Sequence, residues 1–372
     1  MSWQTRIKDN VTTAEELKDI LGLSPEEYAL IRDEIKTFPM SVTRYYLSLI
    51  DPGDPDDPIR KMAVPSAHSI FLDGDFDTSG EQSNTKIAGV QHKYSQTALI
   101  LTTSRCAMYC RHCFRRRLVG LEDEETTEDI GSAVQYIRAH PEINNVLLSG
   151  GDSFMMQTTM IEAWLDQLCS LDQLDFVRFG TRTIVTFPQR ILEDPKLCDV
   201  LSHWCRKKQI YVVTHFNHPR EMTEEAIRAI ALLQNAGIIL KNQTVLLRGV
   251  NDDSAVLGDL LRKLTQVGIV AHYIFQCRPV KGVKSIFQVP LGEGIEIVQA
   301  ANAMQNGLGK TADYTMSHVT GKLRILGRGR DGNLIFQYKQ AKDPDMVNRI
   351  LVGDAAGEMW LPEDVRECLS FV

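Results

Sequence analysis

Apolar runs alternate with helix-like patterns through the middle of the chain. Runs typical of buried strands fall at residues 98–103, 145–149, 176–182, 209–214, 238–247 and 268–276. Helical patterns, with apolar residues every three or four positions, lie between them at 126–139, 158–170, 191–206, 222–236 and 253–266. This alternation predicts an α/β fold: a partial (β/α)6 barrel of the TIM type, open on one side, with its chemistry at the carboxyl ends of parallel strands.

The flanking regions lack this alternation. Residues 12–62 look helical, with capping boxes beginning at Thr13 and Ser24. Little periodicity is visible over 65–95, where the acidic stretch 73–81 is typical of a solvated loop. A helix near 290–306 and a strand pair at 322–326 and 333–338 follow the barrel. We therefore expect an N-terminal helical region and linker (1–95), a barrel (96–310) and a C-terminal segment (311–372).

Composition narrows the function classes. The 372 residues are 43% hydrophobic and 24% charged, as in ordinary globular proteins, and the formal net charge of -7 gives no general attraction to nucleic acid. No apolar run approaches the roughly 20 residues of a membrane helix, and the N-terminus lacks a secretory pattern. Five of the eight cysteines are scattered, which favours a reducing, cytoplasmic compartment.

The other three cysteines, Cys106, Cys110 and Cys113, lie within eight residues just after the first barrel strand. Three thiolates aimed at one spot suit a 4Fe-4S cluster with one iron left open, whereas structural zinc takes a fourth Cys or His. The alternative is a cluster of buried or redox thiols. Gaps of three and then two residues resemble the motif of the radical S-adenosylmethionine (SAM) enzymes.

Polar and glycine residues end several of the predicted strands. Those of the second strand are Ser149, Gly150, Gly151 and Asp152. The glycines let a backbone approach a ligand closely, although a double glycine before Asp is also common in a tight turn. His215, His218 and Gln243 are candidate donors to a ribose or carboxylate. The two histidines also have the spacing of a metal pair, but no carboxylate nearby completes it.

Three basic residues are candidate site residues, and two of them have a second interpretation. Lys322 begins a late strand and is either a surface lysine or one that holds pyridoxal phosphate (PLP). Arg278 is either a pocket cation for an anionic substrate group or a solvated strand end. Arg115, two residues beyond the last cysteine of the motif, is well placed to grip a carboxylate with its guanidinium fork.

Several motifs together resemble the lysine 2,3-aminomutase family of radical SAM enzymes. They are Val11–Leu17, Asp54–Arg60, Cys106–Arg117, Leu147–Asp152, Pro188–Ile191, Thr214–Pro219 and Val245–Asn251. The resemblance implies a 4Fe-4S cluster, SAM and PLP as cofactors. It also implies that a 5′-deoxyadenosyl radical takes a β-hydrogen from a free amino acid, after which the amino group moves from Cα to Cβ.

The resemblance also implies roles for individual residues. Cys106, Cys110 and Cys113 hold the cluster, Lys322 holds PLP, and Arg115 binds the substrate carboxylate. The neighbourhood of SAM is His112, Ser149, Gly150, Gly151, Asp152, His215 and Gln243. The expected partners are a small amino acid and an electron donor such as flavodoxin or ferredoxin, with a homo-oligomer possible in the family.

Departures from the family pattern concern the substrate. Lysine-using members carry an aspartate at the position of Arg278 and another just before the cofactor lysine, where 314–321 here has no carboxylate. Glutamate-using members place a cation at the Arg278 position, so we expect a substrate other than lysine, with an acidic side chain such as that of glutamate. A lyase, dehydratase or epimerase of the same radical type, and an aminomutase that acts on a protein, remain alternatives.

Other departures concern the cofactors. The glycine-rich loop that precedes the family's lysine is replaced by 317–321, and Thr97 stands where the family carries an arginine. Either Lys93 and Tyr94 receive the PLP phosphate, or PLP is absent. The family's C-terminal cysteine zinc site has no counterpart, because Cys368 stands alone, so we expect no zinc.

Overall fold

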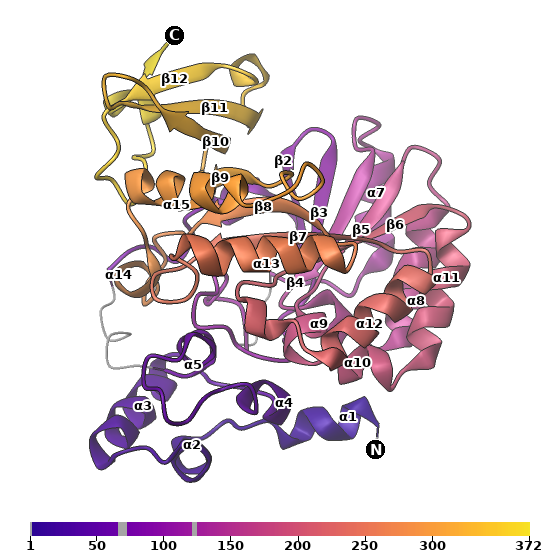
Figure 1. The fold of residues 1–372 in the computed structure, drawn as a ribbon. Coiled ribbons are helices and arrows are strands. Elements are labelled where there is room, and N and C mark those ends of the chain that lie inside the picture. Colours follow the sequence, from indigo (N-terminus) through magenta and orange to yellow (C-terminus); the bar gives the residue numbers. More distant parts are fainter. Residues whose placement is uncertain (1, 66–72, 121–124) are drawn as a thin grey trace.

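The computed structural model describes residues 2–65, 73–120 and 125–372. Figure 1 shows the N-terminal helices at one end of the molecule, a central sheet with its covering helices, and the C-terminal strands at the opposite end. Residues 66–72, part of the expected linker, lie outside the described residues.

The N-terminal region is helical, as the sequence predicts. Its helices are α1 (Trp3–Arg6), α2 (Ala14–Leu21), α3 (Pro25–Thr37), α4 (Arg44–Leu47) and α5 (Pro58–Ala63). The Thr13 side chain caps α2 by accepting from the Glu16 amide, and Ser24 forms a full capping box with Glu27 at the start of α3. Apolar residues of both helices, including Leu17 and Ile31, are buried in the main core.

One sheet of thirteen strands runs through the described residues in chain order, each strand pairing with the next. The strands are β1 (Thr85–Ile87), β2 (Val90–Tyr94), β3 (Thr97–Thr103), β4 (Asn145–Gly150), β5 (Phe176–Gly180), β6 (Gln209–Thr214), β7 (Ile239–Leu246), β8 (Val270–Gln276), β9 (Asp313–Ser317), β10 (Gly321–Arg328), β11 (Leu334–Ala341), β12 (Ile350–Gly353) and β13 (Ser370–Phe371). Strands β3 to β9 are parallel, and antiparallel strands continue the sheet on both sides. The fold is therefore mixed α/β with a large open sheet.

Helices connect the parallel strands and cover the sheet. They are α7 (Ile130–Arg138), α8 (Thr158–Cys169), α9 (Thr183–Thr186), α10 (Gln189–Leu192), α11 (Pro195–Cys205), α12 (Glu224–Asn235), α13 (Ser254–Gln266), α14 (Lys284–Phe287) and α15 (Leu291–Ala303). The short helix α6 (Glu81–Asn84) instead precedes β1. Figure 1 shows α8, α11, α12 and α13 along the outside of the sheet. Val146 and Leu148 of β4 and Trp164 of α8 are fully buried, as expected for strands covered by helices.

The predicted strands and helices between 98 and 276 all appear, with ends shifted by a few residues. The pattern at 191–206 is divided into α10 and α11, because Asp194 caps a new helix whose first residue is Pro195. Strand β5 ends at Gly180, two residues before the predicted end.

The flanks contain more strands than the sequence indicates. Residues 85–94, expected to lack regular structure, form β1 and β2. In β2, Gln91 and Lys93 line an internal cavity, so polar residues occupy positions where apolar ones would have signalled a strand. β9 adds a seventh parallel strand, and β12 and β13 lie in a tail that has no clear pattern.

Candidate active site

One cavity of about 360 Å³ gathers every candidate for the cluster, the cofactors and the substrate except His218. Its lining includes Lys93, Tyr94, Cys106, Cys110, His112, Cys113, Arg115, Ser149, Gly150, Gly151, Asp152, His215, Gln243, Arg278 and Lys322. Six lysines and arginines, but two carboxylates, line the cavity within the described residues. Such an excess of positive charge favours anionic ligands.

The cysteine loop follows β3 at its carboxyl end. Cys106, Cys110 and Cys113 are free thiols that all face the cavity. Burial raises the pKa of each thiol, to about 11 for Cys113. The thiolate forms that bind iron are therefore stabilised only by neighbouring positive charge, such as that of a bound metal.

Arg182 lies directly behind this loop and was not recognised from the sequence. Its Nη1 donates to Cys110 Sγ at 2.7 Å, and its Nη2 donates to Glu221 Oε1 at 2.6 Å. The residue is 8% exposed and lines the cavity. Arg182 could have been found from its position just beyond β5, since basic residues at the carboxyl ends of parallel strands face the site.

The end of β4 passes close to the cysteine loop. A Cβ on Gly150, whose φ is +120°, would lie 2.3 Å from the Thr103 carbonyl oxygen, and a Cβ on Gly151 would lie 2.4 Å from that of Arg105. Only glycine fits this approach. Asp152 holds the turn together, because its carboxylate accepts from the Thr181 hydroxyl at 2.6 Å and from the Arg182 amide at 2.7 Å.

Two histidines reach the cavity from different elements. His112 Nε2 accepts from the Asn217 side-chain amide at 3.2 Å, while its buried Nδ1 has no hydrogen-bond partner in the described part of the chain. His215 donates from Nδ1 to the Gln243 carbonyl at 3.0 Å, and burial together with Arg182 lowers its pKa to about 4. His218 instead accepts from the Arg220 amide and does not line the cavity, so the structure does not pair it with His215 as a metal site.

Lys322 projects from the start of β10 into the cavity. Its Nζ lies 4.6 Å from the centre of the Tyr273 ring. Burial, followed by the nearby cations, of which Arg178 and Lys339 contribute most, lowers its pKa to about 7. A lysine with such a pKa is largely a neutral nucleophile at mildly alkaline pH.

Lys93 and Tyr94 approach the same cavity from β2. Lys93 Nζ donates to the His318 carbonyl at 2.7 Å, and burial, followed by Arg278, lowers its pKa to about 7. The Tyr94 hydroxyl is buried and has no hydrogen-bond partner among the described residues. A buried polar group of this kind normally has a partner, which here a ligand in the cavity can supply.

Arg115 is held by a carboxylate that sequence reasoning missed. Its Nε and Nη2 both contact Glu81 Oε1, at 2.9 and 2.8 Å, and its Nη1 donates to Ser149 Oγ at 2.9 Å. Arg117 binds the second oxygen of Glu81 at 3.0 Å. Burial alone raises the pKa of Glu81, but the two arginines outweigh it and lower the pKa to about 2.

The expectation of a solvated acidic loop is therefore wrong at its last residue. Glu81 is 6% exposed and lines the cavity. The preceding acidic residues gave no hint of this, because the burial of Glu81 depends on arginines more than thirty positions away.

Arg278 faces the cavity and is not a solvated strand end. Its guanidinium stacks 4.3 Å from the centre of the Phe114 ring, and its Nη2 donates to Ser317 Oγ at 2.9 Å. Its Nη1 is buried without a hydrogen-bond partner in the described part of the chain. Arg178 of β5, which the sequence reading also missed, lines the cavity and donates to Asn145 Oδ1 at 2.6 Å.

Comparison with known proteins connects this geometry to a family. Residues 100–260 match the model of the radical SAM superfamily. An Aquifex aeolicus protein provisionally assigned as an L-lysine 2,3-aminomutase is 40% identical over 357 residues, which cover 95% of each chain. The L-lysine 2,3-aminomutase of Clostridium subterminale is 40% identical over 82% of this chain and 73% of its own. The glutamate 2,3-aminomutase of Clostridioides difficile is 37% identical over 82% of this chain and 71% of its own.

The chain belongs to the lysine 2,3-aminomutase family of radical SAM enzymes. Members of this family are isomerases that use a 4Fe-4S cluster, SAM and PLP. The family resemblance expected from the sequence motifs is thereby confirmed. Among the described residues, no helix is both long and apolar enough to cross a membrane.

Proposed function

We propose that this family member is a PLP-dependent radical SAM 2,3-aminomutase whose substrate is a free amino acid with an anionic side chain. One observation carries the proposal: a single cavity joins three thiols, Lys322 and Arg278, which come from three distant parts of the chain. The excess of cations around it supports ligands that carry carboxylates or phosphate.

The residues that line the cavity fit a 4Fe-4S cluster. Cys106, Cys110 and Cys113 supply the three thiolates of a cluster with one open iron. When bound, cluster and SAM supply a carbon-centred radical by one-electron reduction. The polar and glycine residues proposed to surround SAM are His112, Ser149, Gly150, Gly151, Asp152, His215 and Gln243.

Arg182 and the unpartnered Nδ1 of His112 also suit a bound cluster and SAM. Both are cavity groups that can donate a hydrogen bond, Arg182 to Cys110 Sγ and His112 to a ligand acceptor. The glycines at the end of β4 let the cysteine loop lie directly against the strand end that is proposed to contact SAM. The reducing equivalents are proposed to come from a flavodoxin or ferredoxin.

For PLP the fit rests on Lys322 and on the groups around it. A largely neutral amine, which its low pKa provides, is the form that attaches to the PLP aldehyde. Lys93 and the free Tyr94 hydroxyl are proposed to bind the phosphate. When bound, PLP carries the substrate amino group and delocalises an unpaired electron.

For the substrate, Arg115 is proposed to bind the α-carboxylate. Glu81 and Ser149 hold the guanidinium in place, so the arginine is oriented before the substrate arrives. Arg278 is proposed to take the side-chain anion through its unpartnered Nη1. A lysine substrate would bring an ammonium group to a site that already holds unmatched positive charge.

The proposal also includes the arrangement of the protein. Strands β3 to β8 are proposed to curve as a partial barrel around the cavity, between an N-terminal part (1–95) and a C-terminal part (311–372) that contributes Lys322. The supporting observation is that residues at the carboxyl ends of β4 to β8, together with the cysteine loop after β3, line the cavity.

The test is an anaerobic assay with SAM, PLP and a strong reductant. Glutamate, aspartate, lysine and alanine are supplied separately, and the β-amino isomers are quantified by NMR. Turnover of an acidic amino acid, at least about a hundredfold better than lysine, is expected from the loss of charge complementarity. Turnover of lysine but of neither acid would overturn the substrate assignment, and a deaminated or epimerised product would favour a lyase or epimerase.

A paired variant identifies the residue responsible. Arg278→Asp reverses the charge at the proposed side-chain site and is expected to abolish turnover of the acid and to admit lysine. Arg328→Asp, which alters a half-exposed arginine on β10, is the control and is expected to leave the preference unchanged. An unchanged preference in Arg278→Asp would place the specificity elsewhere.

A further inference from the structure

Outside the cavity, two histidines and a glutamate converge behind strand β2. His92 lies in β2, and His140 and Glu142 lie in the connection from α7 to β4. One potential ligand atom from each lies within 4.8 Å of the other two. The side chains of Gln91 and Lys93 line the cavity, so His92 points to the opposite side of the strand, towards α7.

Backbone carbonyls hold both imidazoles in defined tautomers. His92 Nε2 lies 3.0 Å from the Ser95 carbonyl, and His140 Nδ1 lies 2.7 Å from the Tyr136 carbonyl. A carbonyl only accepts, so each of these nitrogens carries the proton. The other nitrogens, Nδ1 of His92 and Nε2 of His140, therefore present lone pairs.

This is the arrangement that orients metal-binding histidines in proteins. A metal-ligating imidazole characteristically donates its second N–H to a backbone carbonyl or carboxylate, which selects the tautomer and the ring orientation. Here both histidines make this hydrogen bond to a backbone carbonyl. The His140 ring is also stacked on Tyr136, with centroids 4.0 Å apart, which restricts its rotation.

We propose that His92, His140 and Glu142 form a binding site for Zn²⁺ that is separate from the cofactor cavity. Two imidazoles and a carboxylate suit zinc, with water as the fourth ligand. Ligand atoms around tetrahedral zinc lie about 3.4 Å apart, given bonds of about 2.1 Å. The three ligand atoms must therefore move slightly closer together on binding zinc. The exposed Glu142 side chain is free to move towards the two histidines.

Zinc binding would break one existing hydrogen bond, between Tyr136 and His92. The Tyr136 hydroxyl lies 3.0 Å from His92 Nδ1 and donates to it. Zinc replaces this neutral hydrogen bond with a stronger metal–nitrogen bond. None of the three ligands is a cysteine, so the site differs from the family's C-terminal cysteine zinc site.

The position of the site indicates what the metal does. The pairing of β2 with β3 loses its regular register between Gln91 and Tyr94, so the ladder does not fully restrain His92 and its neighbour Lys93. A cation joining His92 to the α7–β4 connection would clamp this part of β2 to its covering helix. The metal is then structural, and it restrains the strand that brings Lys93 and Tyr94 to the cavity.

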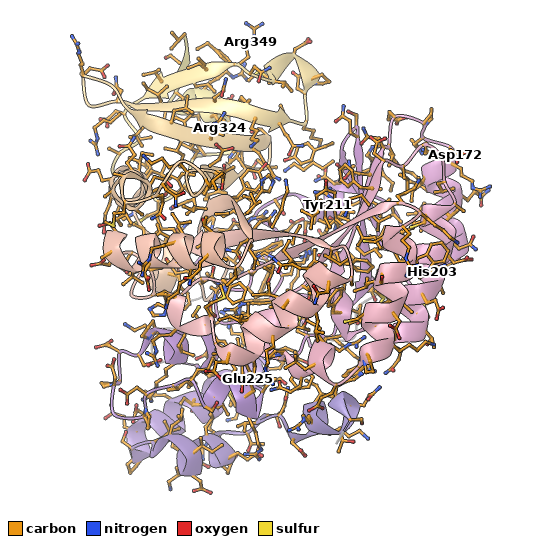
Figure 2. The ribbon with its side chains drawn as sticks, turned by 45° about the vertical axis from the view of Figure 1, so that its right-hand side comes forward. Asp172, His203, Tyr211, Glu225, Arg324 and Arg349 are labelled. Carbon is orange, nitrogen blue, oxygen red and sulfur yellow. The ribbon has the colours of Figure 1, made fainter. Side chains whose placement is uncertain are left out.

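The test measures zinc binding by the enzyme with its iron–sulfur cluster in place, so that the cluster thiols are occupied. Protein is dialysed against buffered Zn²⁺, and bound zinc is quantified by mass spectrometry for the wild type, His140→Ala and Glu142→Gln. His203→Ala, an exposed histidine on α11 (Figure 2), is the matched control. The wild type and control are expected to bind one zinc more per chain than His140→Ala.

Thermal unfolding provides a second readout that does not depend on background sites. Zn²⁺ is expected to raise the melting temperature of the wild type and of His203→Ala but not of His140→Ala. Glu142→Gln changes an exposed side chain, so the fold is retained, and zinc affinity is expected to fall about tenfold or more. Equal zinc content and equal thermal shifts in all four proteins would overturn the proposal, whatever the aminomutase assay shows.

Discussion

Lys322 shows how the chemistry of one residue depends on its neighbours. An isolated lysine has a pKa of 10.5, but burial beside Arg178, Lys339, Arg278 and Lys93 lowers the value to about 7. Because the pKa in the folded protein lies below that of the unfolded chain, protonation of Lys322 opposes folding below about pH 7. This penalty diminishes as the pH rises towards 10.5.

The same shift predicts how PLP uptake depends on pH. The neutral amine is the reactive form, so the rate at which PLP-free enzyme acquires its visible PLP absorption should rise through about pH 7. Stopped-flow mixing at a series of pH values measures this rate, with Lys322→Ala as the blank. A rate that stays flat through neutral pH and rises only near the ordinary lysine pKa would contradict the assignment.

Individual residues also show what a sequence conveys and what it does not. The thiols could be singled out by their spacing, whereas Lys322 and Arg278 stood out only through the family resemblance, since a lysine or arginine at a strand end is as often a surface residue. Glu81 and Arg182 could not, because each is important through partners far along the chain. His92 and His140 are likewise forty-eight positions apart, and only the fold brings them together.

At the scale of elements, the turn after β4 carries the strictest local requirement. Gly150 combines a φ of +120° with a carbonyl oxygen 2.3 Å from where its Cβ would lie. Gly150→Ala should therefore lower the free energy of unfolding by about 2–4 kcal/mol, through backbone strain and displacement of the cysteine loop. It should also reduce the iron retained after cluster reconstitution.

Gly307→Ala is the control for this prediction, because a Cβ there meets nothing within 4 Å. Its urea midpoint and iron content should match those of the wild type. If both glycine variants behaved alike, the close approach of β4 to the cysteine loop would not be needed.

Strands and helices could be predicted from the sequence where apolar residues are regularly spaced. They could not be predicted where polar side chains face the interior. Strands β3 to β8 and their helices follow from periodicity, because one side of each is packed in the core. In strand β2, the side chains of Gln91 and Lys93 face a polar cavity. Its sequence therefore lacks the regular apolar pattern of a buried strand. The predicted strand pair at 322–326 and 333–338 corresponds to β10 and β11. The open sheet still exceeds the expected barrel, since β12 and β13 extend it through pairings that no short pattern encodes.

At the scale of the whole molecule, the N-terminal helices support the cysteine loop. Glu34 of α3 forms a buried ion pair with Arg111, which lies between two of the cysteines, and Arg116 is 3.7 Å away. Tyr46 of α4 donates to Glu221, the residue that also binds Arg182. Trp3 of α1 packs in a small apolar cluster with Ala107 of the loop itself.

The buried ion pair between Glu34 and Arg111 predicts that a substitution in α3 destabilises the cysteine loop. Glu34→Gln leaves Arg111 buried without its counter-charge and should lower the free energy of unfolding by about 3–5 kcal/mol. Asp33→Asn, which removes an exposed ion pair with Lys36 on the same helix, should change it by less than about 1 kcal/mol. Urea unfolding of both variants measures the difference, and equal losses would show that the N-terminal helices do not brace the loop electrostatically.

We propose that the thiols of the β3 loop and Lys322 of β10 serve one reaction in one cavity. The most direct test follows deuterium from the β-carbon of labelled glutamate, or of whichever acid is turned over, into the 5′ position of the nucleoside derived from SAM. Mass spectrometry should detect the transfer in the reconstituted wild type, and Lys322→Ala and Cys110→Ala should abolish it. Product formation without any deuterium in the nucleoside, or transfer that survives both substitutions, would contradict the account.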